Sequence, residues 1–394
     1  MDAVTAAPAR PTGRLRLGRT SFGLIERSPD SAPGGSSKSP LRIAMLAPPW
    51  IPVPAPGYGG VESVVSTLTE ALVGHGHDVT LFCAPGSTSR ATVVNLLSES
   101  HPDEIERSLY EVDHVGRAFD RIDLAADGDR FDVIHDHCGF TGLAMADRID
   151  TPLVHTLHGP FTAETAAFYK HHGHKAELVG ISRAQLASAP PGLGPLRSIP
   201  NPIDLGAWPL TERKGDYLLW VGRMTEEKGP HRAIAAARAV DVPLVLAGVI
   251  QPGQQAFFDQ EIAQHIDGTR VQFVGEVDGS VKRSLFAQAR GLLMPIRWDE
   301  PFGMVMVEAL ACGTPVIAFP EGAAREIVID GRTGFLVNDE RAMADAIGQL
   351  HRIDARGCRA WVREHCDAQV VAAAYERIYR SVASPRLAEA LAGV

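Results

Sequence analysis

The sequence predicts an α/β protein made of two doubly wound domains, each built on a parallel sheet. Short apolar segments of strand length alternate with helix-like segments along most of the 394 residues. This alternation is typical of strand–helix–strand crossover units. It stops at a polar, proline-containing stretch, residues 200–216, and then restarts. The chain is also long for a single domain, so two domains of similar size are expected.

The first half is expected to begin its ordered structure at Leu41. A buried strand, RIAMLA, is predicted at residues 42–47, followed by a loop rich in Pro and Gly and an amphipathic helix over residues 61–73. Further strands are predicted at residues 77–83, 131–135, 152–157 and 176–181, with helical stretches between them.

The second half repeats the alternation after a predicted hinge at residues 200–216. Strands are predicted at residues 217–221, 242–247, 270–274, 291–296 and 315–319. The intervening helices are predicted near residues 230–240, 280–289, 304–311 and 341–350. A last helix, near residues 369–382, has no strand after it, so we expect it to cross back over the first half.

Four parts of the chain follow from this pattern. Residues 1–40 are rich in Ala, Pro, Gly, Ser and Arg and lack the apolar core of a secretory signal, so they are expected to be a disordered extension. Residues 41–203 and 204–366 form the two domains, and residues 367–394 form the crossover helix and tail. Ligands of open parallel sheets bind beyond the carboxyl ends of the strands, so the predicted site is a cleft between the two sheets.

Composition restricts the function classes. The formal net charge of −9 argues against nucleic-acid binding, which needs a basic face. No run of about 18 apolar residues occurs, so no membrane span is expected, although a local patch can still dock on a membrane. Five cysteines without metal-type spacing favour free thiols in a reducing compartment, so a cytoplasmic location is predicted: Cys83, Cys138, Cys312, Cys358 and Cys366.

Two glutamates lie eight residues apart in Glu300-Pro-Phe-Gly-Met-Val-Met-Val-Glu308, a separation of about two helical turns. Gly303 marks a point where a helix can begin close to a ligand with free backbone N–H groups. The glutamates can also belong to a solvated helix face. The residues between them are nearly all apolar, however, and buried carboxylates need partners such as sugar or ribose hydroxyls.

Positive charge follows the first strand of the second half in Gly222-Arg-Met-Thr-Glu-Glu-Lys-Gly229. Arg223 can bridge two phosphate oxygens and Lys228 can act as a point charge. Surface charge on a loop is the alternative, but the position at a strand end favours a diphosphate site that needs no metal.

Glycines also follow the first strand, in Gly57-Tyr-Gly-Gly-Val-Glu62, and open a helix. Such a loop lets a backbone approach an anion, or it is simply a flexible turn. The glycine spacing differs from that of the dinucleotide fingerprint.

Histidines end two strands of the first half. His158 either faces a sugar or caps a turn. His135 and His137 offer too few ligands for a metal, so contact with an acceptor or with water is expected instead. The Asp127-Gly-Asp129 sequence precedes a strand and is interpreted as a turn.

With these motifs the chain resembles the retaining GT-B-fold glycosyltransferases of the family-four type, which include mannosyl-, glucosyl- and sucrose-synthase-like members. The resemblance spans about residues 41–382. Its most specific parts are Gly222-Arg223…Lys228-Gly229 and the Glu300…Glu308 pair. Supporting parts are Gly59–Gly60, His158-Gly159, Ser182, Pro200-Asn201…Asp204 and Glu321-Gly322…Glu326-Ile327-Val328.

The resemblance implies roles for the charged residues. Arg223 and Lys228, beside Gly222, would bind the donor diphosphate. Glu300 would contact donor-sugar hydroxyls near the reacting carbon, and Glu308 would bind the ribose hydroxyls.

The remaining implied contacts involve backbone groups and one ring. Gly59 and Gly60 would close over the phosphate, and His158 would lie near the sugar or the acceptor. Backbone amides of residues 302–305 would hold sugar and phosphate oxygens, and the strand end at residues 275–277 would hold the base. The predicted catalytic residues are thus His158, Arg223, Lys228 and Glu300, and the further donor-binding residues are Gly59, Gly60, Gly222, Gly275, Val277, Phe302, Gly303, Met304, Val305 and Glu308.

Two departures from the family pattern affect the substrate contacts. Pro202 follows Asn201 where the family often has Gly, which stiffens the hinge and leaves the donor contact of Asn201 open. The loop at residues 48–56 is long and rich in Pro, and we expect it to shape the acceptor side.

The expected activity is transfer of a hexose from a GDP- or UDP-sugar to an acceptor hydroxyl, with retention and by a front-face mechanism. No cofactor or metal is expected, because the nucleotide sugar is the substrate. The acceptor is left open among small molecules, lipids and saccharides. A sugar-nucleotide-binding scaffold and a sugar-nucleotide epimerase of the same fold are the alternatives, and the products formed without acceptor distinguish them.

Overall fold

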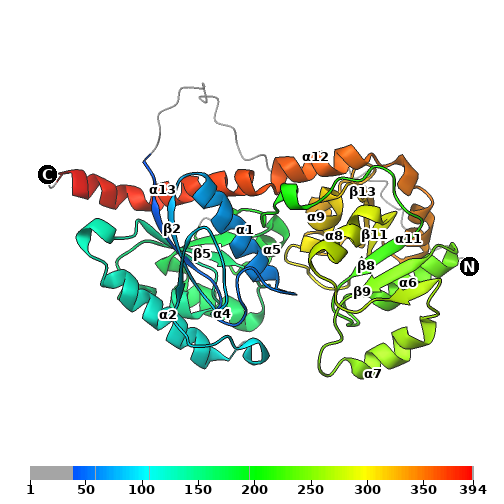
Figure 1. Ribbon diagram of the computed structural model, residues 1–394, viewed down its shortest axis with the longest axis horizontal. Helices are drawn as coiled ribbons and strands as arrows, with labels where there is room; N and C mark the ends of the chain where they lie inside the picture. The colour runs from blue at the N-terminus through cyan, green and yellow to red at the C-terminus, as the bar shows by residue number, and fades with distance from the viewer. Residues whose placement is uncertain (1–38, 58, 106, 195, 393–394) are drawn as a thin grey trace, which may run out of the picture. The chain divides into compact units, whose positions relative to one another are not determined.

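The computed structural model describes residues 39–57, 59–105, 107–194 and 196–392, shown in colour in Figure 1. The predicted disordered extension lies outside this part of the chain, apart from its last two residues. The described residues form two parallel sheets joined by helices, so the α/β prediction with two doubly wound sheets is confirmed.

The first sheet has seven strands in the order β3-β2-β1-β4-β5-β6-β7, all in parallel pairs. Its strands are β1 (Arg42–Leu46), β2 (Asp78–Cys83), β3 (Thr92–Asn95), β4 (Val133–Asp136), β5 (Leu153–Leu157), β6 (Glu177–Gly180) and β7 (Arg197–Ser198). The helices of this half are α1 (Gly60–Gly74), α2 (Ser108–Asp123), α3 (Thr141–Ala144), α4 (Ala163–His172) and α5 (Arg183–Ala187).

Helices cover both faces of this sheet. Alternate residues of a strand point to opposite sides, so each face has its own apolar side chains to bury. Ile43 and Met45 of β1 belong to the core under α1. Ala44 and Leu46 belong to the core under α2, with Phe119. Each face therefore has its own buried layer.

The second sheet has six parallel strands in the order β10-β9-β8-β11-β12-β13. They are β8 (Leu218–Val221), β9 (Leu244–Ala247), β10 (Val271–Phe273), β11 (Gly291–Met294), β12 (Val316–Ala318) and β13 (Gly334–Leu336). The helices are α6 (Pro230–Ala239), α7 (Gln255–Phe257), α8 (Gly279–Gln288), α9 (Met304–Ala311), α10 (Ala324–Ile327), α11 (Glu340–Ile347) and α12 (Ala355–His365).

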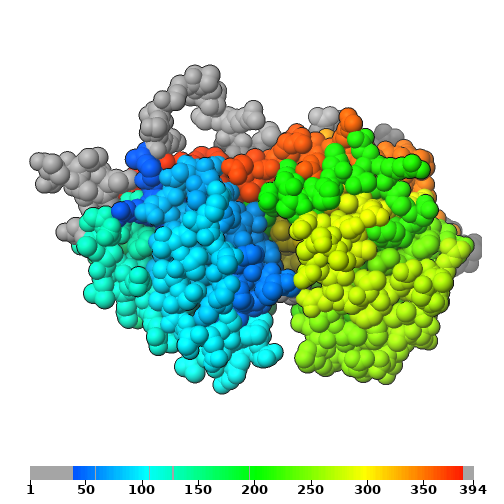
Figure 2. All heavy atoms as spheres, viewed as in Figure 1, coloured from blue at the N-terminus to red at the C-terminus, as the bar shows by residue number. Residues whose placement is uncertain are grey.

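The segment that connects the first half to the second, near Ile203, lies beside the segment that connects the second half back to the first, near Asp367. Ile203 forms a parallel bridge with Asp367, and the Ile203 N–H donates to Cys366 O at 2.8 Å. Arg359 of α12 donates to the carbonyl oxygens of Leu205 and Trp208 at 2.8 and 2.6 Å. Figure 2 shows these green and orange segments in contact.

The last helix, α13 (Ala368–Ala392), crosses back and packs on α1 (Figure 1). Val371, Tyr375, Ile378 and Tyr379 belong to the same buried cluster as β1 and α1. The predicted return of this helix to the first domain is confirmed, and the helix is longer than the predicted residues 369–382.

Several elements were not predicted. Strands β3, β7 and β13 lie at sheet edges and consist mostly of exposed or half-buried residues, so they lack the continuous apolar run by which the other strands were predicted. Helix α12 follows α11 without a strand between them, which departs from the alternation used to place the other elements. Within the described part of the chain, no helix is both long and apolar enough to cross a membrane.

Candidate active site at the carboxyl ends of the strands

The predicted charged residues follow the carboxyl ends of neighbouring strands in the second sheet. Arg223 and Lys228 lie in the loop after β8, and Glu300 lies in the loop after β11. Because β8 and β11 are adjacent and parallel, these loops leave the same edge of the sheet. The structure therefore brings the predicted cations and the first glutamate together.

Lys228 and Glu300 form an ion pair with Nζ and Oε2 2.5 Å apart. Their side chains are only 15% and 13% exposed. Trp298 Nε1–H donates to the same carboxylate oxygen at 3.0 Å, and Lys228 Nζ lies 4.5 Å from the centre of the Trp298 ring. A cation and a carboxylate are thus held side by side in one small, partly desolvated place.

Glu300 does not lie on the helix that contains Glu308. Helix α9 begins at Met304, after Gly303 with φ of +89°, so the eight-residue spacing spans a loop, a left-handed residue and one helical turn. The first N–H groups of a helix have no intrahelical partners. Those of Met304 and Val305 follow Gly303 directly, while Phe302 is buried beside them.

The loop after β12 supports Glu300 from its backbone side. Ala323 N–H donates to Glu300 O at 2.9 Å. Gly322 has φ of +48°, and a Cβ there would lie 2.3 Å from the Glu300 carbonyl oxygen. This close approach explains why a glycine follows Glu321.

Glu308 is buried, with 6% exposure, and has one paired and one unpaired oxygen. Lys282 Nζ of α8 lies 2.7 Å from Oε1. Oε2 is buried and has no hydrogen-bond partner among the described residues. Sequence reasoning missed Lys282, because nothing in the composition of α8 distinguishes it from an exposed lysine.

Arg223 is also incompletely paired. Its Nη1 donates to Gln251 Oε1 at 3.3 Å, while its Nε is buried without a hydrogen-bond partner in the described part of the chain. Gln251 was not predicted, since it lies in a loop after β9 with no recognisable motif.

Two further predicted donor contacts lie on the loop after β10. Gly275 has φ of +70°, and its carbonyl accepts from Gly248 N–H at 2.8 Å. Val277 is half-buried. The glycine loop of the first half lies near this segment: a Cβ on Gly57 would be 3.0 Å from Glu276 Oε1.

Gly59 and Gly60 begin helix α1 at the carboxyl end of β1. Gly59 is its N-cap, and a Cβ there would lie 2.4 Å from the Ala55 Cβ. Gly60 is exposed with open space around it. In the first turn, burial raises the pKa of the Glu62 carboxyl. Tyr58 of this motif lies outside the described residues.

Contacts between the halves place the end of β5 near Glu300. Pro160 and Gln185 line a small pocket together with Glu300 and Gly322. Gln185 Nε2 donates to the Gly159 carbonyl at 2.7 Å. Glu326 of the second half accepts from the Ala184 N–H at 2.6 Å.

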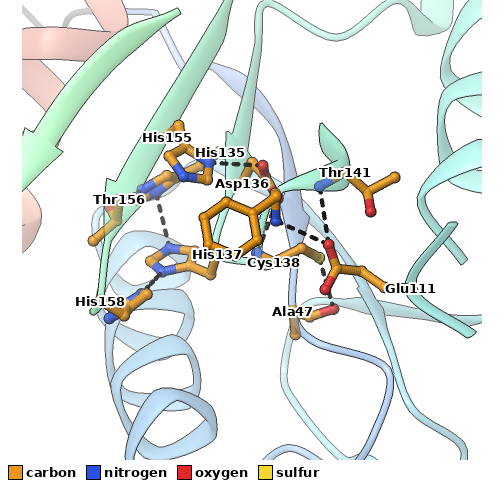
Figure 3. A network of polar contacts seen from close by, with 11 residues as sticks. Ala47, Glu111, His135, Asp136, His137, Cys138, Thr141, His155, Thr156 and His158 are labelled. Carbon is orange, nitrogen blue, oxygen red and sulfur yellow. Dashed lines mark hydrogen bonds and ion pairs between the residues drawn. The ribbon is translucent and has the colours of Figure 1, made fainter. Parts of the chain in front are cut away.

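His158 is half-buried, and it ends a row of three histidines (Figure 3). His158 Nε2 lies 2.9 Å from His137 Nδ1, and His137 Nε2 lies 3.3 Å from His135 Nδ1. Burial lowers the pKa of His158 to about 3 and holds those of His135 and His137 well below the ordinary value. All three rings are therefore neutral at pH 7.

The expected contact of His135 and His137 with water or an acceptor is wrong. Their exposures are 0% and 2%, because α13 covers His135, with Tyr379 OH 2.6 Å from its Nδ1. The neighbouring Asp136 pairs with His155, Oδ2 to Nδ1, at 2.8 Å. The Asp127–Asp129 segment is a short 3-10 turn, as predicted.

The five cysteines are free, as predicted, and all five are buried. Among the described residues, His75, His77 and Glu376 form the one group of three potential metal ligands within reach of each other. Leu41 N–H donates to His77 Nδ1 at 3.1 Å. The proton of a neutral His77 ring is therefore on Nε2, the nitrogen that faces Glu376, and this disfavours a metal ion there.

Comparisons with known proteins agree with this architecture. The family model "Glycosyltransferase Family 4" matches residues 58–206, and "Glycosyl transferases group 1" matches residues 209–359. A phosphatidyl-myo-inositol mannosyltransferase of Mycolicibacterium smegmatis is 30% identical over 87% of this chain and 94% of its own length. A glycogen synthase of Mycobacterium tuberculosis is 28% identical over 86% of this chain and 94% of its own.

Among solved structures, AviGT4, a glycosyltransferase involved in avilamycin A biosynthesis, is similar with a TM-score of 0.70. It is 27% identical, and the match covers 88% of this chain and 98% of that one. Two parallel-sheet domains, the strand-end residues and the full-length relatives lead to one conclusion: the chain belongs to the GT-B glycosyltransferases of the family-four type.

Proposed function

We propose that the protein is a retaining hexosyltransferase that uses a nucleotide-diphosphate sugar, either a GDP- or a UDP-sugar. The observation that carries the proposal is the Lys228–Glu300 pair directly before the N-terminus of α9. A donor has an anionic diphosphate bonded to a hydroxyl-rich ring. A cation beside a carboxylate fits the junction between these two parts.

The unpaired buried atoms support the same assignment. Leaving a buried polar group without a partner costs about 1–3 kcal/mol, and Arg223 Nε and Glu308 Oε2 are both in this state. A phosphate oxygen would satisfy the first and a ribose hydroxyl the second. Binding of the donor would therefore recover energy that the free protein lacks.

The proposed reaction is a front-face substitution. The acceptor oxygen forms a bond to the anomeric carbon on the face from which the diphosphate leaves. The bond from that carbon to the phosphate oxygen breaks, and a leaving phosphate oxygen takes the acceptor proton. Arg223, Lys228 and the free amides of α9 stabilise the negative charge on the leaving group. No side chain is assigned as a nucleophile.

Relatives support a hexose but differ in acceptor. One is named as a mannosyltransferase acting on phosphatidyl-myo-inositol and another as a glycogen synthase. The acceptor of this chain therefore stays open among small molecules, lipids and saccharides.

The testing experiment is a panel of UDP- and GDP-sugars, measured by thermal shift and by slow release of nucleotide. One donor should raise the melting temperature and be slowly hydrolysed. Once an acceptor has been identified with that donor, the glycosylated product should have the same anomeric configuration as the donor. Failure of every nucleotide to stabilise folded protein contradicts the proposal. An epimerised donor would indicate an epimerase instead.

A further inference from the structure

We propose that Lys282 on α8 is a positioning residue that directs one oxygen of Glu308 toward the donor, and that the site thereby prefers ribonucleotides to their deoxy forms. In this arrangement Glu308 makes the contact with the ribose hydroxyls, and Lys282 acts through Glu308. The inference rests on the proposed function, because its ligand is the nucleoside diphosphate part of the donor.

Lys282 and Glu308 belong to different helices of the second half. Helix α8 follows β10 and helix α9 follows β11, and the two helices pack on each other (Figure 1). Lys282 lies near the start of α8, and its Nζ is 2.7 Å from Glu308 Oε1. The ion pair therefore joins the helix after the predicted base-binding strand end to the helix after the predicted diphosphate site.

The ammonium group of Lys282 is held on more than one side. Besides the carboxylate of Glu308, the ring centres of Trp208 and Phe286 lie 5.7 and 6.0 Å from Nζ. These two rings pack edge to face, with their centres 5.7 Å apart. Aromatic faces attract a cation at such distances. Lys282 therefore occupies a defined position, and its side chain is only 29% exposed.

This pairing leaves the two oxygens of Glu308 in different states. Oε1 accepts from Lys282, whereas Oε2 is buried without a hydrogen-bond partner among the described residues. A carboxylate is planar, so a contact that fixes Oε1 also fixes the direction of Oε2. An ionised carboxylate can only accept hydrogen bonds. The free oxygen therefore suits a hydroxyl, such as those of a ribose, and repels a phosphate oxygen.

Lys282 also determines how strongly Glu308 can bind a hydroxyl. Hydrogen bonds to an ionised group are roughly twice as strong as those between neutral groups. Removing one partner of a buried ion pair leaves an uncompensated charge, which is strongly destabilising. Without Lys282, the carboxylate would take up a proton or turn toward solvent. Either change removes the strong contact with the ribose.

A direct contact between Lys282 and a phosphate is the alternative role for this cation. Such a contact would strengthen the binding of ribonucleotides and deoxynucleotides equally, because both have the same diphosphate. A positioning role instead changes the ratio between the two affinities. The ratio is therefore the quantity to measure, since a general loss of stability or of positive charge leaves it unchanged.

The test is calorimetric titration of the full chain with UDP, GDP and their dideoxyribose counterparts, which lack both ring hydroxyls. We expect the wild type to bind the better ribonucleotide at least about tenfold more tightly than its dideoxy form. Lys282→Met removes the charge and keeps an unbranched side chain, and it should reduce this ratio to about threefold or less. Lys282→Arg keeps a cation and should retain most of the ratio.

Arg283→Met is the matched control, because it removes the same charge from the next position of α8, which is also half-buried. It should keep the wild-type ratio. In a Glu308→Gln background, Lys282→Met should change the ratio no further, because the residue through which it acts is already altered. Lys282→Gln serves the same purpose if Lys282→Met fails to fold.

An unchanged ratio in the uncharged Lys282 variants overturns the inference. A wild type that binds the ribonucleotide and its dideoxy form alike also overturns it. In both cases the binding of UDP or GDP would still support the proposed function. If neither UDP nor GDP binds to the folded wild type, the proposed function fails and the inference fails with it.

Discussion

The two halves of the molecule treat the polar groups at their sheet edges in opposite ways. In the first half, His137 is paired on both sides and Asp136 is paired with His155, so the side chains satisfy one another. In the second half, Arg223 Nε and Glu308 Oε2 are buried without partners in the described part of the chain. These residues of the first edge are paired with one another, although both ring nitrogens of His114 on α2 are buried without partners in the described part of the chain, whereas the unpaired atoms of Arg223 and Glu308 belong to charged side chains.

The two edges also differ in charge: the histidine row of the first is neutral and the second contains charged side chains. The histidine row of the first half is neutral, because burial lowers the pKa of each ring. The second edge contains Arg223 and the Lys228–Glu300 ion pair. Under the proposed function, the charged side chains that hold the anionic part of the donor belong to the second half, and the first half offers it only the backbone of the Gly59–Gly60 loop.

The largest effect should come from removing the cation of the second edge. Lys228→Ala is expected to lower the transfer rate by about 10²–10³-fold, because a charge that stabilises the leaving diphosphate is lost. The loss of turnover should exceed the loss of stability, because Glu300 keeps the Trp298 hydrogen bond, but the melting temperature should also fall since both side chains of the pair are only 15% and 13% exposed. Steady-state kinetics and a melting curve measure the two effects.

The matched control is Lys170→Ala, which removes an exposed lysine from α4 of the first half. Its rate should stay within about twofold of the wild type, as expected for a solvated surface charge. Equal transfer rates for Lys228→Ala and the wild type would contradict the assignment of the donor diphosphate to the charged residues of the second half.

The next effect concerns the neutral histidines of the first half. Burial lowers the pKa of His114 on α2 to about 4, against an ordinary value of 6.5. Between pH 6.5 and pH 4 the His114 ring is therefore protonated in the unfolded chain and neutral in the folded chain. The free energy of unfolding consequently falls as the pH is lowered through this window. His114 alone should contribute about 3 kcal/mol to that loss.

Urea unfolding at pH 7 and pH 4.5 measures this loss. His114→Leu should reduce the pH dependence of the unfolding free energy, while His171→Leu, at an exposed position of α4, should leave it unchanged. An identical slope for wild type and His114→Leu would show that the buried ring is not neutral.

The two sheets could be predicted because short apolar segments of strand length alternate with helix-like segments along the chain, as at residues 42–47 and 291–296. The sequence could not show that Glu308 pairs with Lys282, since the two residues are on different helices. The burial of His135 was also missed. The residues that cover it, such as Tyr379, are 244 positions away in sequence, and no local pattern reports a contact of that range.

A smaller effect is expected at the ribose end of the second edge. Glu308→Gln should weaken nucleotide binding by about tenfold, the cost of losing one hydrogen bond to a charged group. The wild type should bind a ribose-deoxy nucleotide less tightly than the parent nucleotide, and the variant should bind both alike. Calorimetric titration of the four combinations measures this coupling.

Glu364→Gln on α12 is the control, because it removes a carboxylate far in sequence from the strand-end loops. If the deoxy analogue loses the same affinity in the wild type and in Glu308→Gln, the unpaired Oε2 is not the ribose contact. The second edge would then be incomplete for another reason.

The smallest effect should come from chelation. Arg223, Lys228 and the amides of α9 already supply positive charge where the diphosphate is expected, so a divalent cation would compete with them for the same oxygens. Adding EDTA should change the transfer rate by less than about twofold, the scatter expected when no bound ion takes part. Complete loss of transfer with EDTA, restored by one divalent ion, would mean that the charge on the second edge is insufficient. The unpaired Glu308 oxygen would then be the first candidate for a ligand to that ion.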